Sequence, residues 1–458
     1  MTDLKLDKLS LWTEHLESDQ STQLAASVLA NVNADDALID RATAIKNSTS
    51  VFNTSVKVEG APVTNQKASG RCWLFASGNV LRLHMMEKLS VKEFQFSQSY
   101  WFFHDKLERC NYFLNTFAAN MSDEKLNDVE SQLNQHLLTD PTCDGGQFDM
   151  FINIIEKYGA VPHELYPDAF SATSSRRLNF LILTKLREFA EQLKLNSDSL
   201  LPREALVLIQ EMQQEIHRLM VLFLGKPPAP NSQLSWDYKD KDDKVHTLKF
   251  TPLLLYKDVL GVDVSNWVSL LNDPRNPYDS LIKIDKLGNV VGAKDVSYVN
   301  IEVDALAKYA VERIKSNQAV FFGTHTPIYM DKKRGIMDES LYSYNLIGFK
   351  SDQSKSSRIK YKQSLMTHAM TLTAVHLDEN GNPVRWRVEN SWGKDSGQNG
   401  YYVMDHQYFK DYVYQIVVDK NDLLEVHKEV LNSTEPIVLP PWDPMGALAI
   451  FKNEVDMI

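Results

Sequence analysis

The sequence predicts an α+β fold, with helices in the N-terminal part of the chain and strands in the C-terminal part. Residues 72–89 are largely apolar and free of proline, and residues 176–224 repeat apolar side chains every three or four positions, as helices do. From residue 368 onward the chain is β-rich, and the turn at 378–382 carries the Asn-Gly pair typical of a hairpin. Helices and strands in separate halves are typical of α+β proteins.

The other elements can be assigned in chain order. Amphipathic periodicity predicts helices at residues 7–16, 23–29, 102–117, 149–158 and 303–314. Proline interrupts a helix, so the proline-rich stretch 226–232 ends the helical region, and a hairpin around a charged turn is expected from 236–238 and 247–250. Buried or half-buried strands are expected at residues 319–323, 371–376, 384–389 and 401–404.

Composition places the chain among folded proteins of a reducing compartment. Of 458 residues, 43% are hydrophobic and 24% are charged, which excludes a disordered or collagenous chain. Three cysteines are too few for a disulfide framework. No signal peptide is evident at the start, and the longest apolar run, 219–224, is far shorter than the roughly 20 residues of a membrane helix. We therefore expect a cytoplasmic protein without a membrane partner.

A first candidate motif is Gln66 followed by Cys72 at the predicted start of a helix. The positive end of a helix dipole favours a thiolate, which is the nucleophilic form of cysteine. A glutamine amide nearby can donate to an oxyanion together with the backbone N–H of the cysteine. Taken alone, however, Cys72 suits a small buried hydrophobe equally well, and Gln66 suits an ordinary loop residue.

The second motif places His368 at the start of one predicted strand and Asn390 at the end of the next. A cysteine nucleophile needs a base within hydrogen-bond reach and a group that orients this base. Separately, His368 suits a core histidine and Asn390 a turn former before Gly393. Gln66, Cys72, His368 and Asn390 together, each in a suitable local setting, predict a catalytic set.

These motifs resemble the papain-like cysteine peptidases. The resemblance rests on Gln66…Cys72-Trp73, on Thr367-His368-Ala369 and on the run Asn390-Ser391-Trp392-Gly393. Cys143-Asp144-Gly145-Gly146 is similar to the cleft loop of that family. Cys72 and His368 lie 296 positions apart, against roughly 130–150 in papain-type chains, so about 150 residues are inserted. With residues 68–73 and the tail 440–449, this insertion narrows the resemblance to the bleomycin hydrolase family, which includes bacterial aminopeptidases of the C type.

The resemblance implies a role for each matching residue. Cys72 attacks the carbonyl, His368 shuttles protons, Asn390 orients His368 and Gln66 completes the oxyanion hole. Trp392 covers the pair His368–Asn390, and Gly145 and Gly146 offer backbone groups to an extended substrate. Two positions depart from the papain pattern: Cys143 has no obvious disulfide partner, and Ser396 stands where many relatives have a second tryptophan. The remaining histidines and cysteine that we considered are assigned to structure: His104, Cys110, His325 and His376.

The resemblance also divides the chain into five parts. They are a helical arm, a helical catalytic lobe with the nucleophile, an inserted region, a β-rich lobe with His368 and Asn390, and a tail directed to the cleft. Their expected limits are residues 1–60, 61–170, 171–300, 301–435 and 436–458. The papain-like two-lobe fold, with a large helical insertion and terminal extensions, is thus the expected architecture.

The expected function is a thiol aminopeptidase that hydrolyses peptide and aminoacyl-amide substrates through an acyl-enzyme on Cys72. The resemblance further implies a homo-hexamer and activity on the amide of bleomycin. No motif suggests a cofactor, and none suggests a metal. Two alternatives stay open: an endopeptidase with an open cleft, and a regulatory or nucleic-acid-binding protein on a peptidase scaffold. The net charge of −11 argues against general nucleic-acid binding, although a local basic patch is compatible with it.

The tail carries a final expectation. In the family the chain ends at or just after the equivalent of Ala449, and its carboxylate lies in the cleft, where it pairs with the substrate's free ammonium. Here residues 450–458 follow. We therefore expect Cys72 to cut the tail near Ala449, which would make Ala449 a substrate-binding residue.

Overall fold

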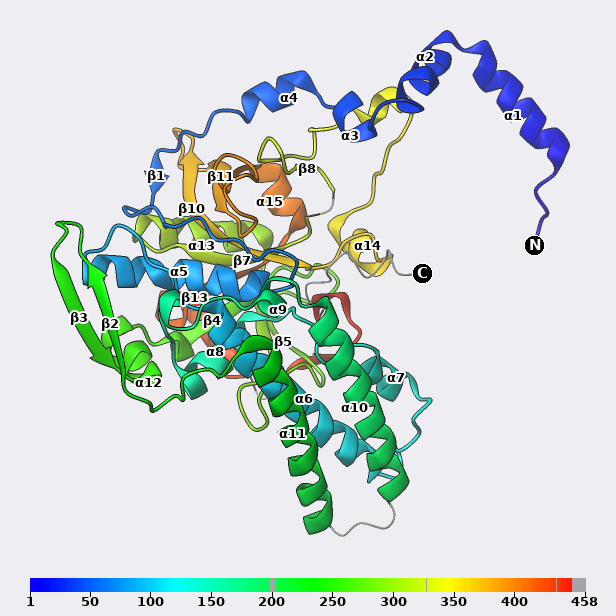
Figure 1. Cartoon of the computed structure of the whole chain (residues 1–458). Coiled ribbons are helices and arrows are strands. Elements are labelled where there is room, and N and C mark those ends of the chain that lie inside the picture. Colours follow the sequence, from blue (N-terminus) through cyan, green and yellow to red (C-terminus); the bar gives the residue numbers. More distant parts are fainter. Residues whose placement is uncertain (198–201, 327, 434, 447–458) are drawn as a thin grey trace.

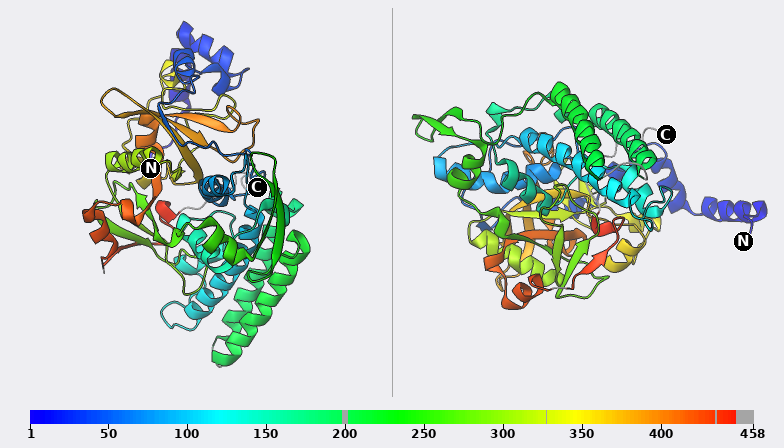
Figure 2. Two further views of the ribbon diagram at one scale, coloured as in Figure 1. Left: turned by 90° about the vertical axis from the view of Figure 1, so that its left-hand side faces the viewer. Right: turned by 90° about the horizontal axis from the view of Figure 1, so that it is seen from below.

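A computed structural model describes residues 1–197, 202–326, 328–433 and 435–446, and it confirms the α+β class. One large mixed sheet crosses the molecule, a group of long helices projects from one side of it, and an N-terminal arm stands away from the body (Figures 1 and 2). Among the described residues, no helix is both long and apolar enough to cross a membrane.

The sheet contains twelve strands within the described residues. Eleven follow the order β14-β5-β6-β4-β13-β7-β10-β11-β12-β9-β8, and β1 pairs with β10. Strands β2 (Leu234–Lys239) and β3 (Val245–Phe250) form a separate hairpin, as expected. The sheet strands are β1 (Thr54–Ser55), β4 (Trp267–Leu271), β5 (Ser280–Ile284), β6 (Ser297–Asn300), β7 (Val320–Thr324), β8 (Met330–Asp331), β9 (Ile336–Met337), β10 (His368–Leu377), β11 (Pro383–Glu389), β12 (Tyr401–Asp405), β13 (Val413–Asp419) and β14 (Ile437–Leu439).

Every helix that the sequence predicted is present, whereas the short helices at residues 132–139, 170–173, 252–254, 355–360, 406–412 and 425–431 were not predicted. The long predicted segment 176–224 consists of two helices, α10 and α11, which pack against each other and against α6 (Figure 1). The helices are α1 (Leu6–Ser18), α2 (Gln20–Leu29), α3 (Ala34–Ala37), α4 (Arg41–Lys46), α5 (Cys72–Leu89), α6 (Gln98–Met121), α7 (Gln132–Thr139), α8 (Phe148–Tyr158), α9 (Phe170–Thr173), α10 (Arg176–Asn196), α11 (Pro202–Leu224), α12 (Pro252–Leu254), α13 (Val303–Lys315), α14 (Lys355–Lys360), α15 (His406–Tyr412) and α16 (Glu425–Leu431). Short 3₁₀ turns lie at His163–Leu165, Val264–Asn266, Tyr344–Ile347, Lys420–Asp422 and Pro444–Gly446, and a π-turn lies at Leu255–Leu260.

Two hydrophobic cores lie on opposite faces of the sheet. Successive side chains of a strand point to opposite faces, so Phe321 of β7 joins the core shared with α5 and α8, while Phe322 joins the core shared with α13. Helix α5 packs on β10 and β7 from one face, and α13 packs on β10, β13 and β7 from the other. The sheet therefore runs between α5 and α13 (Figure 1).

The expected boundary at residue 300 does not separate the insertion from the β-rich lobe. Strands β4, β5 and β6, within the region that we assigned to the insertion, continue the sheet next to β13. Strand β14, from the expected tail, adds to β5 in parallel. We did not predict these strands, because short apolar segments acquire their strand identity from the sheet edge that they extend.

Candidate active site

Cys72 is the first residue of α5, at the point where a polar loop enters the buried helix. Its side chain is 2% exposed, and its Sγ lies 4.0 Å from the carbonyl oxygen of Gly70. The backbone N–H of Ala369, the residue after His368, also faces the sulfur and favours its charged form. The fold thus brings the thiol beside the start of β10, although the two segments are almost 300 residues apart.

His368 and Asn390 meet because of the register between β10 and β11. Thr371 pairs with Glu389 across these strands, which places Asn390 beside the beginning of β10. The Nε2 of His368 lies 2.9 Å from the Oδ1 of Asn390. The ring of Trp392 covers this contact, with its centroid 4.8 Å from that of His368. This is the arrangement that the second motif predicts.

Gln66 lies between the two lobes. Its Nε2 donates to the carbonyl oxygen of Ser69 at 2.7 Å, and its Oε1 accepts from the hydroxyl of Ser391 at 2.7 Å. The backbone N–H of Gln66 also donates to the carbonyl oxygen of Ser391. Since a carboxamide carries two N–H groups, it can serve Ser69 and a second acceptor together.

A small cavity joins the candidate residues. Cys72 and His368 line it, together with Gly146 and Gln147. Gly146 packs so closely on the indole of Trp73 that an added Cβ would lie 2.5 Å from its Cε2 atom. Glycine at this position therefore lets the segment that carries Gly146 pack directly against Trp73. The cavity is completed by Phe321, Gly323, Met366, Thr367, Ala369 and Gln415.

Burial opposes an isolated charge on either reacting group. It raises the pKa of Cys72 to about 11, although backbone N–H groups act in the opposite direction. It lowers the pKa of His368 to about 4, although the hydrogen bond to Asn390 raises it. A thiolate facing an imidazolium stabilises both charges, so two such groups ionise as a pair.

The other residues that the sequence singled out lie in different surroundings. Gly145 turns its carbonyl oxygen to the guanidinium of Arg109 rather than to the cavity. The hydroxyl of Ser396 pairs with that of Tyr402, and Cys143 is a free thiol. Ala449 lies outside the described residues. The side chains assigned to structure include buried Cys110, His104 stacked on Tyr158, His325 beside the carbonyl of Leu365, and His376 within β10.

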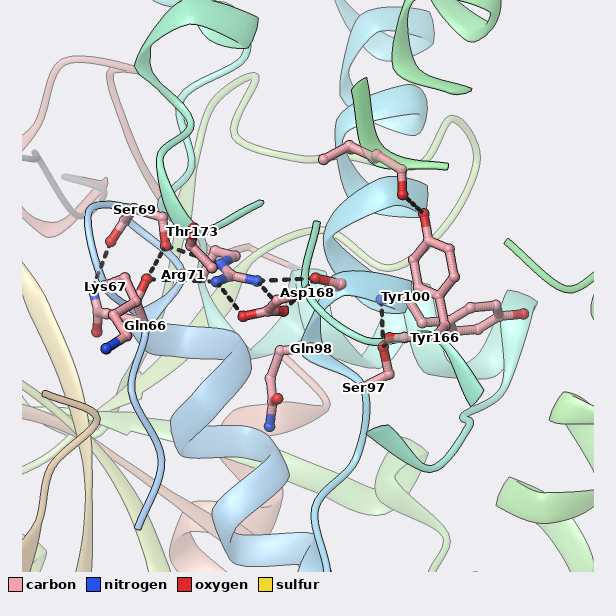
Figure 3. Close-up of polar contacts among 12 residues, drawn as sticks. Gln66, Lys67, Ser69, Arg71, Ser97, Gln98, Tyr100, Tyr166, Asp168 and Thr173 are labelled. Atoms are coloured by element: carbon pink, nitrogen blue, oxygen red, sulfur yellow. Dashed lines mark hydrogen bonds and ion pairs between the residues drawn. The ribbon is translucent and has the colours of Figure 1, made fainter. Parts of the chain in front are cut away.

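Sequence reasoning missed a group of buried charges beneath the nucleophile loop. Arg71, next to Cys72, is fully buried, and its guanidinium contacts Asp168 and Ser69 (Figure 3). It also donates to the hydroxyl of Ser99. The signal was the presence of charged residues within otherwise apolar helices, but their partners are distant in the sequence and cannot be assigned from it.

Comparison with known proteins agrees with this geometry. The model of the Peptidase C1-like family matches residues 3–446. The chain is 51% identical to "Cysteine proteinase 1, mitochondrial" of Saccharomyces cerevisiae (strain YJM789), over 97% of this chain and 93% of that protein. It is 41% identical to the bleomycin hydrolase of Mus musculus, over 97% and 99%. The crystal structure of PepW from Lactobacillus rhamnosis superimposes with a TM-score of 0.93 at 34% identity, covering 98% of this chain and all of that one.

The chain therefore belongs to the Peptidase C1-like family. It is a cysteine peptidase, and its relatives include proteins named bleomycin hydrolase, as the sequence motifs predicted.

Proposed function

We propose that this protein is an aminopeptidase whose nucleophile is Cys72 and whose acid and base is His368. The observation that carries the proposal is the meeting of Cys72, at the start of α5, with the pair His368–Asn390 at one cavity. This combination supplies a nucleophile, a base and a group that orients the base.

In the proposed reaction, His368 accepts the thiol proton and the Cys72 thiolate attacks the substrate carbonyl. The oxyanion accepts hydrogen bonds from the backbone N–H of Cys72 and from the second N–H of the Gln66 amide. Imidazolium then protonates the leaving amine, and an acyl-enzyme remains on the sulfur. Water, deprotonated by His368, hydrolyses this thioester and restores the thiol.

We assign the selectivity for a free amino end to the C-terminal tail. Residues 437–446 are held firmly: β14 extends β5, Met445 is buried, and Arg275 forms an ion pair with Asp443 in which their atoms Nη2 and Oδ1 are 2.7 Å apart. This anchoring ends three residues before Ala449. A carboxylate exposed by cleavage near Ala449 would pair with the substrate ammonium.

A pair of substrates tests the aminopeptidase. An aminoacyl-coumarin amide with a free amino group should be hydrolysed far faster than its N-acetylated twin. Equal turnover of both would support an endopeptidase with an open cleft instead. No turnover of either would favour the peptidase-scaffold alternative, in which the fold serves regulation or nucleic-acid binding. Release of ammonia from bleomycin, followed in the same preparation, tests the amide hydrolase activity.

Intact-mass measurement tests cleavage of the tail. Wild-type protein should be lighter than the Cys72→Ala variant by about the mass of residues 450–458, because only the former can cut itself. Arg275→Met loosens the anchor and should reduce the preference for free amines. Full-length wild type that still selects free amines would contradict this account of selectivity.

The N-terminal arm supports the proposed assembly of identical chains. No residue of α1 is buried, and Leu9, Trp12 and Leu16 share one face of this helix with exposed fractions of 37%, 54% and 53%. An apolar face on an arm that stands away from the body suits a second copy (Figure 2). Light scattering should detect a hexamer, and Trp12→Glu with Leu16→Glu should give smaller species. An unchanged mass would exclude α1 from the contact.

We also propose a cytoplasmic location, on the basis of the free thiols at positions 72, 110 and 143. The name of the yeast relative assigns that protein to mitochondria. Cell fractionation with an antibody to this chain distinguishes the two compartments.

A further inference from the structure

Three buried ion pairs lie beneath the proposed nucleophile. One joins helix α6 to the segment that carries Gly145 and Gly146, one links two turns of α6, and one joins the loop before α5 to the segment before α9. Each pair is neutral, and in each a cation with at most 4% exposure meets a carboxylate from another segment or another turn. The pairs are Lys106–Asp144, Arg109–Asp105 and Arg71–Asp168.

Asp144 contacts the chain on both sides of Cys72. Its carboxylate accepts from the backbone N–H of Gly70 at 3.1 Å, two residues before the thiol. Its backbone carbonyl accepts from the indole N–H of Trp73 at 2.8 Å, one residue after the thiol. A single residue of the cleft wall therefore restrains the loop that presents the sulfur and the first turn of the helix that carries it.

Lys106 is the cation that compensates the buried charge of the Asp144 carboxylate. Its side chain is completely buried in α6, with Nζ 2.8 Å from Oδ1 of Asp144 and 2.7 Å from the carbonyl oxygen of Thr142. The ammonium also lies 5.0 Å from the ring centroid of Phe102. Desolvation offsets much of the attraction within such a buried pair, so the pair contributes little net stability.

We propose that Asp144 and Lys106 form a positioning pair for Cys72. Asp144 holds Gly70 and Trp73 in place around the thiol, and Lys106 neutralises the carboxylate so that its charge does not oppose the thiolate. This inference rests on the proposed role of Cys72 as nucleophile.

The pKa shifts of Asp144 and Cys72 agree with these two roles. Burial alone would raise the pKa of Asp144, but the charge of Lys106 and hydrogen bonds from Lys106, Ser175 and Asn179 outweigh it and bring the pKa to about 2. Asp144 is therefore ionised at neutral pH. Its negative charge is among the influences that raise the pKa of Cys72.

Other charged groups face the same region from each neighbouring element. Arg109 of α6 lies 5.6 Å from the ring of Trp73 and is paired with Asp105, and Arg71 is paired with Asp168. The charges of Cys143 and Asp140 raise the pKa of Arg109. His368 lines the same cavity as Cys72. Because these groups are unchanged in the variants, replacing Lys106 or Asp144 alone shows the effect of that one residue on Cys72.

The test compares Asp144→Asn and Lys106→Met with wild type. Two quantities are measured: the pH dependence of iodoacetamide alkylation of the Cys72 peptide by mass spectrometry, and kcat/KM on the free-amine substrate. Asp144→Asn removes a negative charge, so the pKa of Cys72 should fall by about half a unit. Its kcat/KM should nevertheless fall about 10-fold, because Gly70 loses its ionic acceptor. Lys106→Met should move the thiol pKa upward and also lower kcat/KM.

Lys355→Met is the control, because Lys355 is a half-buried lysine with a desolvated ammonium, bound to Asn272 and to backbone carbonyls of the β-rich lobe. It should cost stability and leave the Cys72 alkylation profile unchanged. Opposite pKa shifts in the two variants support the proposal, and if one of them does not fold, the other decides by the sign of its shift. A folded variant with wild-type alkylation or wild-type kcat/KM would overturn it. An active wild type whose Cys72 is not alkylated would instead refute the proposed function.

Discussion

The two walls of the cleft are held in place by different interactions. On the helical side, Cys72 stands among side chains that bond to one another: Asp144, Lys106 and Arg71 with Asp168. On the β side, His368 and Asn390 are set by backbone ladders, since His368 pairs with Thr324 in β7 and the strand before Asn390 pairs with β10. A side-chain network depends on each of its members, whereas a ladder tolerates most replacements. Substitutions outside the reacting set should therefore harm the helical wall more often.

The two walls are also joined by buried contacts. Arg82 of α5 pairs with Glu389, the residue before Asn390, and both side chains are at most 2% exposed. The hydroxyl of Thr371 in β10 donates to the carbonyl oxygen of Ala76 in α5. These contacts set the distance between the nucleophile helix and the strand that ends at Asn390.

The largest effect should come from the nucleophile itself. Cys72→Ala should abolish hydrolysis of the free-amine substrate, because Cys72 is the only thiol among the described residues that line the cavity. Circular dichroism and the Tm should stay close to wild type. Cys110→Ala and Cys143→Ala serve as controls and should keep most activity. Substantial activity in Cys72→Ala, or labelling of Cys110 by an epoxysuccinyl inhibitor, would refute the assignment.

Removing the base and removing its partner should differ in size. His368→Ala should lower kcat/KM by about 1,000-fold or more, as expected when a general acid and base is lost. Asn390→Ala should cost less, about 10-fold, because His368 stays but loses the hydrogen bond that orients it. That bond raises the pKa of His368, so in Asn390→Ala the descending alkaline limb of the pH profile should move to lower pH. An unshifted limb would contradict the orienting role.

The contact between the walls should govern stability. Arg82→Met leaves the carboxylate of Glu389 buried without its cation, which should cost about 3–5 kcal/mol of unfolding free energy in urea denaturation. The double variant Arg82→Met with Glu389→Leu should recover most of this loss. As a control, Lys315→Met breaks the exposed pair with Glu312 and should hardly change stability. Equal losses in Arg82→Met and Lys315→Met would mean that the buried pair contributes no more to stability than the exposed pair.

The smallest expected effect concerns Lys332. Its Nζ lies 4.4 Å from the ring centroid of Trp392, which in turn covers His368. Burial lowers the pKa of His368, and the charge of Lys332 lowers it further. Lys332→Met should therefore raise this pKa and move the descending alkaline limb of the activity profile upward by a few tenths of a unit. Lys333→Met removes the same charge one residue further on and should shift the limb less.

Much of the architecture followed from local pattern. The helix at 72–89 was predicted to the residue, because the segment is largely apolar, lacks proline and is preceded by a polar loop. The strands β7, β10, β11 and β12 were also predicted, since each carries its own apolar pattern. The residues of β4, β5 and β6 were assigned to the insertion and were not predicted as strands, because nothing in their sequence shows which sheet they extend.

The sequence by itself singled out the proposed reacting groups of this protein, since Gln66, Cys72, His368 and Asn390 are recognisable from residue type and neighbours. It could not determine which charges meet in the interior. Lys106 and Asp144, or Arg82 and Glu389, are 38 and 307 positions apart, and only the packed structure brings them into contact. The physical reason is that chemistry at a site is encoded in residue types, whereas the partner of a buried charge is selected by the folded structure that excludes water from both.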